Sequence, residues 1–478
     1  MKKLFAIFII LLTPMAFGKN ILSPEYSYKQ MKEYIKGSAS FSELEKQIDV
    51  DNIVSDELGI DFIYTNLSEC LKYALEDNYD IKMNEALNRQ KLWNYRNSIT
   101  KILPNIYYDY TRQDLKGEFL VGGIVPVGVH EIATNLYLHV EWDWFKKGKY
   151  FFDALQNKYL SKSAKANKQF SIDETILKTT TAYYNLLLAK LEIEEYRTNI
   201  FELKYYKQIA DARYKAGLDK KYDVKRAEAD LAQAQKIYET GKNALRLKQA
   251  ELAAFMGLEV LCPIYPYETE MIPRDILEKD FSVDELYYIA EETREDIKSL
   301  KAQIQSDIIK KNSNYTDIIP DFSVSYQDGF AGTKRTGLRG NTSLMFRASM
   351  TLGKNMIAGT MTQIKADDEY VKSQRMKLRK KEQEIKTAIL KSYLAKDDAI
   401  KSLEASKKEF EAAQESLNLA IGSYKEGQCA FSEVLDAQTI KSKAKLDIVR
   451  SIADYNKAQI QLLFESGMIS YSKVLKNY

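Results

Sequence analysis

The stretch NLYLHVEWDW, residues Asn135–Trp144, alternates strictly between apolar and polar side chains. A period of two places successive residues on opposite faces and is typical of a β-strand, although the surrounding chain shows mostly helical patterns. The apolar face of this strand carries Leu136, Leu138, Val140, Trp142 and Trp144. Its polar face carries Tyr137, His139, Glu141 and Asp143.

Three further segments alternate in the same way, at residues 105–110, 322–327 and 342–352, and the last of them places Phe346 on its apolar face. The stretches around them, ILPNIYYDY at 102–110, IIPDFSVSY at 318–326 and TSLMFRASMTL at 342–352, have roughly the 9–11 residues of a tilted transmembrane β-strand. An ordinary half-buried sheet gives the same pattern, so one segment alone leaves both interpretations open. We expect exposed loops in the glycine-rich intervals. These intervals contain Gly122, Gly123, Gly128, Gly329, Gly332, Gly337 and Gly340.

The N-terminus predicts export from the cytoplasm. Lys2 and Lys3 precede a short apolar run, and small residues at Ala16 and Gly18 fit a signal-peptide cleavage site after about Gly18. The run is too short to span a bilayer, and no other stretch approaches about 20 uncharged apolar residues. Export and the fourfold strand pattern together favour a membrane sheet. Four strands cannot close a barrel, so several chains must contribute to it.

Composition argues against several classes of function. The 478 residues include 70 basic and 67 acidic side chains, and this near-neutral balance does not favour a nucleic-acid partner. Cys70, Cys262 and Cys429 are too far apart for a disulfide framework or a metal motif, and there are only two histidines. We find no P-loop, HExxH, GxSxG or dinucleotide fingerprint. The sequence therefore predicts that the protein is not an enzyme and needs neither a cofactor nor a metal.

The helical part of the chain is long and appears twice. No proline or glycine interrupts the interval between Lys149 and Ala216, which as one helix would reach roughly 100 Å and implies a coiled coil. YKAGLDKKYDVKRA at 214–227 resembles YKEGQCAFSEVLDA at 424–437, with each residue 210 positions after its counterpart. We therefore divide the chain into a signal peptide (1–18), an N-terminal extension (19–66), two structural repeats (67–270 and 271–467) and a C-terminal tail (468–478).

These features resemble the TolC-like outer-membrane efflux family over roughly residues 67–467. The resemblance rests on LSECLKYALEDNYDIKMNEA at 67–86, on the strands that follow Pro104 and Pro320, and on the two 210-related motifs. It implies a mainly helical fold in which three protomers give four strands each to a 12-stranded outer-membrane barrel and pack their helices into a periplasmic tunnel. It also implies a periplasmic adaptor and an inner-membrane pump as partners. The alternative is a periplasmic coiled-coil adaptor or a structural protein of an envelope complex.

The resemblance also assigns candidate site residues. Glu433 and Asp436 match the family's acidic ring at the tunnel entrance, where crowded carboxylates can select cations. The candidates for a latch between the hairpin tips are Tyr424, Asp223 and Tyr214, but Cys429 stands where the family has a latch arginine. The tip turns expected to dock the adaptor contain Gly217, Leu218, Gly427 and Gln428. For the strands we expect lipid contact at the apolar faces and an aromatic belt near Trp142 and Trp144.

Overall fold

The computed structural model describes residues 63–121, 125–143, 146–217, 219–277, 281–350, 356–426 and 428–475. The expected signal peptide and Trp144 lie outside these described residues. The chain divides into two compact units. Among the described residues, the hairpin unit comprises those within 63–81, 172–293 and 385–475, and the sheet unit those within 82–171 and 294–384.

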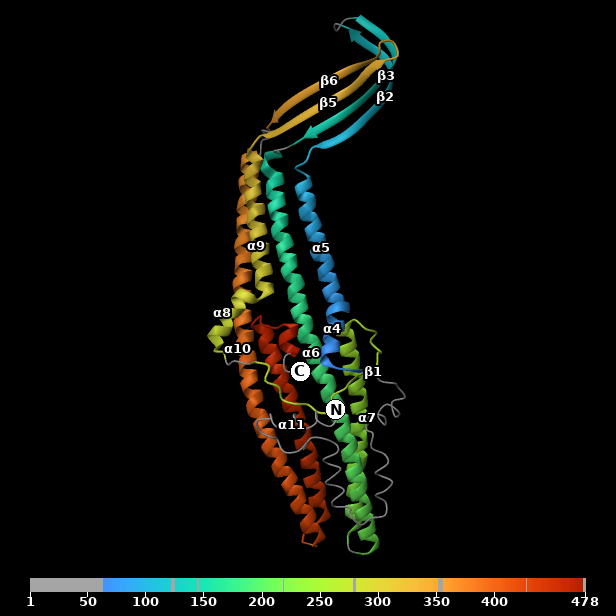
Figure 1. The fold of residues 1–478 in the computed structure, drawn as a ribbon, viewed down its shortest axis with the longest axis vertical. Helices are drawn as coiled ribbons and strands as arrows, with labels where there is room; N and C mark the ends of the chain where they lie inside the picture. Colours follow the sequence, from blue (N-terminus) through green and yellow to red (C-terminus); the bar gives the residue numbers. More distant parts are fainter. Residues whose placement is uncertain are drawn as a thin grey trace, which may run out of the picture. The chain divides into compact units, whose positions relative to one another are not determined.

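The hairpin unit is built from two pairs of long helices (Figure 1). Helix α6 (Lys149–Lys215) is followed by α7 (Lys221–Met256), and α10 (Met356–Lys425) is followed by α11 (Phe431–Glu465). The single long helix expected after Lys149 is therefore confirmed. Among the residues that the structure describes, none of the helices has both the length and the apolar character that a membrane span requires.

Short elements close one end of the hairpin unit. They are β1 (Ile63–Thr65), α4 (Leu67–Asp77), β4 (Ile264–Pro266), α8 (Val283–Thr293) and α12 (Tyr471–Leu475). Strands β1 and β4 pair in parallel. Gly257 ends α7 in the left-handed conformation at φ 74°, and a Cβ there would overlap the carbonyl of Asp77. Only glycine fits here without strain, because it has no Cβ and readily adopts the left-handed conformation.

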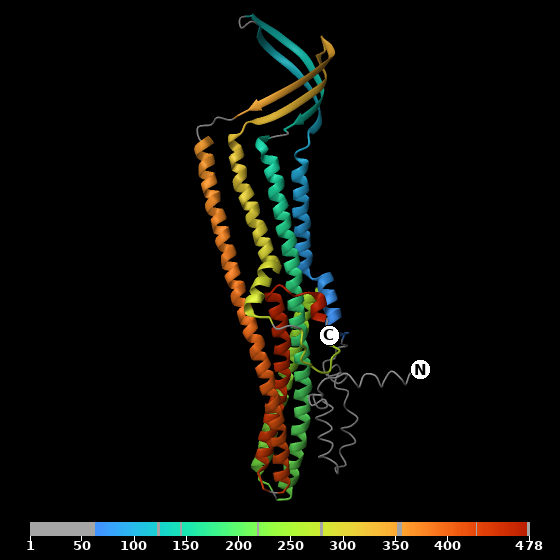
Figure 2. The same ribbon diagram turned by 60° about the vertical axis from the view of Figure 1, so that its left-hand side comes forward.

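In the sheet unit, the helices form a layer of neighbours, which the two ribbon views show side by side (Figure 2). Helix α5 (Tyr79–Thr100) contacts α6 through an ion pair between Glu85 and Lys168 at 3.4 Å. Helix α9 (Glu295–Ser313) contacts α6 through a 2.9 Å hydrogen bond between Ser163 and Ser299. Two short 3-10 helices, Lys146–Gly148 and Asn314–Ile318, precede α6 and β5 respectively.

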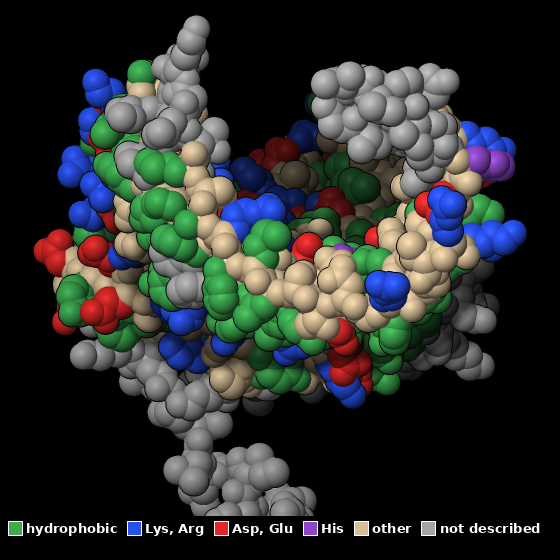
Figure 3. Space-filling view, turned by 90° about the horizontal axis from the view of Figure 1, so that it is seen from above, with side chains coloured by type: hydrophobic (Ala, Val, Ile, Leu, Met, Phe, Trp, Pro, Cys, Tyr) green, Lys and Arg blue, Asp and Glu red, His purple; other side chains and the backbone are tan. Residues whose placement is uncertain are grey.

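The four predicted strands form one antiparallel sheet in the order β2-β3-β5-β6. Their bounds are Asn105–Val121, Val125–Trp142, Asp321–Thr333 and Gly337–Ser349. The register aligns the apolar residues of all four strands, since Ile106 lies opposite Val140, Val140 opposite Tyr326, and Tyr326 opposite Leu344. Directly opposite residues share a face, so the sheet has one apolar and one polar side. Viewed from above, hydrophobic side chains gather along the outer side of the curved band of strands (Figure 3).

Two expectations about the strands were wrong, namely their lengths and the exposed loops at the glycine-rich intervals. The strands have 17, 18, 13 and 13 residues, so they extend well beyond the alternating segments. Gly128, Gly329, Gly332, Gly337 and Gly340 therefore lie inside strands and not in exposed loops, while Gly122 and Gly123 lie outside the described residues. Glycine breaks the apolar alternation but still allows pairing, and it marks places where two backbones approach closely.

We predict that Gly329→Ala destabilises the sheet by roughly 1–3 kcal/mol, as overpacking typically does. A Cβ at Gly329 would overlap the backbone of Leu136 and Tyr137 on the neighbouring strand β3. The measurement is the urea midpoint of tryptophan fluorescence in detergent. The control is Gly117→Ala in β2, where an added Cβ meets no atom within 4 Å. Equal shifts for the two variants would show that the close approach at Gly329 is not the cause.

Candidate functional site at the helical hairpin turns

The two hairpins turn at equivalent points of the 210-residue repeat. The α6–α7 turn includes Gly217, which has a left-handed backbone with φ 76° and open space around its Cβ position. In the α10–α11 turn, the amide of the exposed Gln428 donates to Glu426 at 2.9 Å. The other expected docking residues, Leu218 and Gly427, lie outside the described residues.

Tyr424 joins the two turns. Its side chain is only 7% exposed, and its hydroxyl donates to Asp219 Oδ2 at 2.7 Å. Arg213 Nε donates to the same oxygen at 3.0 Å, and the Arg213 guanidinium lies 4.5 Å from the centre of the Tyr424 ring. Arg213 and Asp219 belong to the first hairpin and Tyr424 to the second. The three residues therefore form a charge-assisted link between the hairpins.

The ionisation of this link is fixed near neutral pH. Burial, together with the hydrogen bond to Asp219, raises the pKa of Tyr424 well above its usual value. The hydrogen bond to Asp219 likewise raises the pKa of Arg213. Tyr424 consequently remains a protonated donor and Arg213 a cation at every physiological pH.

The other two latch candidates make different contacts, although the charge of Asp223 adds to the raised pKa of Tyr424. The Asp223 carboxylate accepts a hydrogen bond from the backbone N–H of Lys220 at 3.3 Å, at the start of α7. The side chain of Tyr214 is exposed. Sequence reasoning missed Arg213 and Asp219, although one signal was available: Asp219 follows Gly217 by two positions, as Cys429 follows Gly427.

Cys429 occupies its turn as a neutral thiol. Its Sγ donates to the backbone oxygen of Ala420 at 3.5 Å, and burial raises its pKa, with a smaller contribution from Glu433. A thiol held in this way makes no ion pair. The charge-assisted contact next to Tyr424 is therefore made by Asp219 and its two donors.

The two residues of the expected acidic ring have different surroundings. Glu433 accepts a hydrogen bond from the backbone N–H of Ala430 at 3.4 Å, which stabilises the first turn of α11. Asp436 forms an ion pair with Arg226 on α7, and these two residues are 210 positions apart, so each is the repeat counterpart of the other. Nearby, burial raises the pKa of Asp230; Arg226 opposes this rise and Asp436 adds to it. Arg226 thus neutralises much of the charge expected at Asp436.

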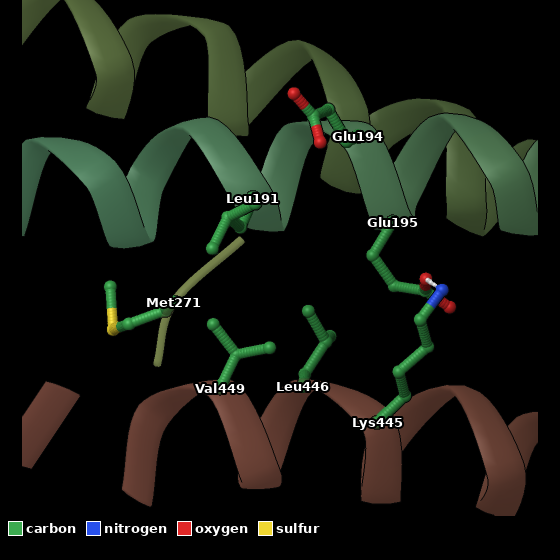
Figure 4. A pocket seen from close by; sticks show the side chains of 7 residues that line it. All are labelled: Leu191, Glu194, Glu195, Met271, Lys445, Leu446 and Val449. Carbon is green, nitrogen blue, oxygen red and sulfur yellow. Dashed lines mark ion pairs between the residues drawn. The ribbon is translucent and has the colours of Figure 1, made fainter. Parts of the chain in front are cut away.

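Buried ion pairs hold α11 against α6 further along the hairpin unit. Lys441 Nζ lies 2.9 Å from Glu202 Oε1, and both side chains are more than nine-tenths buried. Although burial lowers the pKa of Lys441, the adjacent Glu202 and Glu195 raise it overall, so the lysine stays charged. Lys445 pairs with Glu195, and Figure 4 shows the two side chains pointing toward one another beside a cavity of about 20 Å³. Removing one partner of such a buried pair typically costs about 3–5 kcal/mol. The two ion pairs therefore hold α11 firmly against α6.

Within the described part of the chain, no group of three or more His, Cys, Asp or Glu residues could hold a metal ion. The geometry at the turns is one of hydrogen bonds and ion pairs between hairpins. These contacts hold the two hairpin turns next to each other.

Comparison with known structures gives the class of fold. The chain is similar to the outer-membrane channel OprN, with a TM-score of 0.75 and 17% identity over 84% of this chain and 90% of that one. The outer membrane protein VceC from Vibrio cholerae gives a TM-score of 0.72 and 15% identity over 84% and 96%. The MtrE outer membrane channel of Neisseria gonorrhoeae gives a TM-score of 0.71 and 15% identity over 84% and 89%. The chain therefore has the fold of outer-membrane channels.

A family model matches part of the sequence. The model of the outer membrane efflux protein family matches residues 286–467. No curated protein matches the chain. The resemblance to the TolC-like outer-membrane efflux family is confirmed by the family model over residues 286–467, and in fold by the solved channels. Channels of this family are non-enzymatic transport proteins, in agreement with the prediction that the protein is not an enzyme.

We predict that Asp219→Ala loosens the link between the hairpins, because it leaves the buried Tyr424 hydroxyl without its acceptor. An unsatisfied buried donor costs about 1–3 kcal/mol, so backbone amides around Tyr424 should exchange about tenfold faster with solvent. Tyr424→Phe should have a smaller effect, since the Arg213–Asp219 pair remains. The control is Glu426→Ala, an exposed acid of the second turn. Equal acceleration in the Asp219 and Glu426 variants would contradict the proposed link.

Proposed function

We propose that this protein is the outer-membrane channel of an efflux system and works as a homotrimer. Each protomer gives four strands to a 12-stranded barrel, and the helices form a periplasmic tunnel. The single observation that carries this proposal is the shared apolar face, which the register continues across all four strands. The family match supports the same role.

The exposed apolar side chains support the orientation of the sheet. Ile106, Tyr108 and Tyr110 of β2 are 66%, 77% and 62% exposed, and Phe346 of β6 is 74% exposed. A soluble protein rarely exposes so many large apolar groups together, whereas a lipid-facing barrel wall requires them. We propose that Leu136, Leu138 and Val140 face lipid. Trp142, whose indole N–H donates to the carbonyl of Ile102 at 2.8 Å, is then placed at the periplasmic interface.

The helices carry surfaces suited to contact between copies. On α5, Tyr79, Met83 and Leu87 are exposed at intervals of four residues, and on α10 Leu390 and Leu394 are exposed at the same spacing. Residues four apart lie on one helical face, so each set forms a stripe. Burial of these stripes between neighbouring protomers would complete the trimer.

The remaining assignments belong to the same proposal. We propose internal duplication, with repeats at 67–270 and 271–467, because α5-β2-β3-α6-α7 has the same order of elements as α9-β5-β6-α10-α11. The protein exports small molecules or proteins from the cell. The turns at Gly217, Leu218, Gly427 and Gln428 dock a periplasmic adaptor, which connects the channel to an inner-membrane pump. A periplasmic adaptor is the less favoured function, since its hairpin would not carry a four-stranded sheet with an apolar outer face.

The proposal predicts a detergent-extracted trimer in the outer-membrane fraction that conducts ions in planar bilayers. Its mass can be measured by light scattering with correction for bound detergent. A water-soluble periplasmic monomer without conductance would contradict the proposed function.

A second prediction concerns the entrance ring at Glu433 and Asp436. Because Arg226 pairs with Asp436, Arg226→Ala should expose the carboxylate charge and raise the permeability ratio of K⁺ to Cl⁻ by roughly twofold. Glu433→Ala and Asp436→Ala should lower the ratio and weaken block by multivalent cations. The ratio is obtained from reversal potentials across a salt gradient.

The control for the ring is Asp454→Ala, which removes an exposed acid from the same helix α11. This change should leave the permeability ratio close to that of the unmodified channel. A ratio that responds equally to Asp454 and Asp436, or to neither, would contradict the assignment of the ring.

A further inference from the structure

The polar side of the sheet carries a cluster of aromatic rings where β2 and β3 pair. Tyr107 and His139 are directly opposite each other, and their rings stack with centroids 4.9 Å apart and planes inclined by 10°. The ring of Tyr137 meets His139 edge-on at 5.8 Å. Such stacked and T-shaped arrangements are favourable for aromatic pairs. The three rings form what we call the aromatic patch.

Neighbouring strands fix the aromatic patch in place. The Tyr137 hydroxyl accepts a hydrogen bond from Asn341 Nδ2 of β6 at 3.1 Å, across the intervening strand β5. On β5 the residue beside Tyr137 is Gly329, where an added Cβ would overlap both the backbone and the ring of Tyr137. The Tyr107 hydroxyl donates to Glu141 at 3.0 Å. Contacts with residues of all four strands therefore fix the positions of the three rings.

The charges around the aromatic patch are negative. On the polar side of β2 and β3, the register places Asp109 and Glu141 in the rows on either side of Tyr107 and His139. The basic residues of this side, Arg339 and Arg347, lie on β6 at the opposite edge of the sheet. His139 Nε2 is buried and has no hydrogen-bond partner among the described residues. The patch thus combines aromatic faces with nearby carboxylates.

We propose that the aromatic patch of Tyr107, Tyr137 and His139, together with Glu141 and Asp109, is a binding site for planar organic cations. Aromatic faces attract cations and stack with flat rings, and the carboxylates add Coulombic attraction. The inference rests on the proposed function, because the polar side of the sheet lines the lumen only in a closed barrel. It adds to that function a class of molecule that the channel itself contacts.

The test uses N-methylquinolinium, a planar aromatic cation, as a blocker of the ion current through the full-length protein in planar bilayers. The unmodified channel should be blocked by N-methylquinolinium at lower concentration than by tetramethylammonium, which has the same charge but no ring. Tyr107→Leu should raise the half-blocking concentration of N-methylquinolinium roughly fivefold. Glu141→Gln should also raise it.

Tyr108→Leu is the matched control, because Tyr108 is the next residue of the same strand and lies on the apolar side. It removes the same ring from the lipid face and should leave block unchanged. Equal effects of Tyr107→Leu and Tyr108→Leu, or equal block by the two cations, would overturn the proposal.

Equilibrium dialysis of N-methylquinolinium with the detergent-solubilised protein separates this inference from the proposed function. A protein that binds the cation through Tyr107 but does not conduct would overturn the channel and support the site. A protein that conducts but shows neither binding nor block would overturn the site and support the channel.

Discussion

Backbone hydrogen bonding at the two edges of the sheet is the constraint on which the rest of the proposed assembly depends. In the described chain β2 pairs only with β3, and β6 only with β5, so both outer strands present unpaired N–H and C=O groups. In water such edges cost little, but in hydrocarbon each unsatisfied group costs several kcal/mol. A sheet whose outer face is apolar cannot enter lipid until both edges are paired with other copies. In the proposed channel, oligomerisation is then a condition of membrane insertion, and one protomer supplies only a part of the barrel wall.

The hairpin unit is held together by two kinds of contact between its hairpins. Its contacts follow the doubling of the chain: Arg226 and Asp436 are repeat counterparts that pair with each other, and Asp219 of the first turn receives Tyr424 of the second. Both links lie near the turns, and the ring of Tyr424 also packs in the hydrophobic core, 5.2 Å from the ring of Phe431. Further along, the buried pairs of Glu202 with Lys441 and Glu195 with Lys445 are costly to break. The contacts between the two hairpins therefore extend from the turns into the buried part of the unit.

The sequence predicted the elements better than their contacts. The alternation in NLYLHVEWDW identified a strand and its two faces, because period two depends only on local geometry. Strand length was underestimated, since Asp328 and Gly332 interrupt the apolar pattern but continue the pairing. At the turns, Glu433 and Asp436 were assigned from the resemblance to the family's acidic ring. The partner of Asp436 is Arg226, which lies on another hairpin, and helical periodicity gives no information about it. Asp219 was missed for the same reason, because its role arises from Tyr424, 205 positions away.

The two faces of the sheet also differ in how they tolerate polar groups. On the apolar side Asp328 lies between Leu138 and Thr342, and the Thr342 hydroxyl donates to it at 2.6 Å, so the one acid in that row has a partner within the sheet. On the polar side the acids Asp109 and Glu141 lie beside aromatic rings at one edge, and the arginines lie at the other. In a closed trimer, strand β6 of one protomer would lie beside β2 of the next. Each acidic, aromatic region that attracts a cation would then have a strand with arginines as its neighbour. A duct needs contacts of this kind, since binding must be favourable enough for entry and weak enough for release.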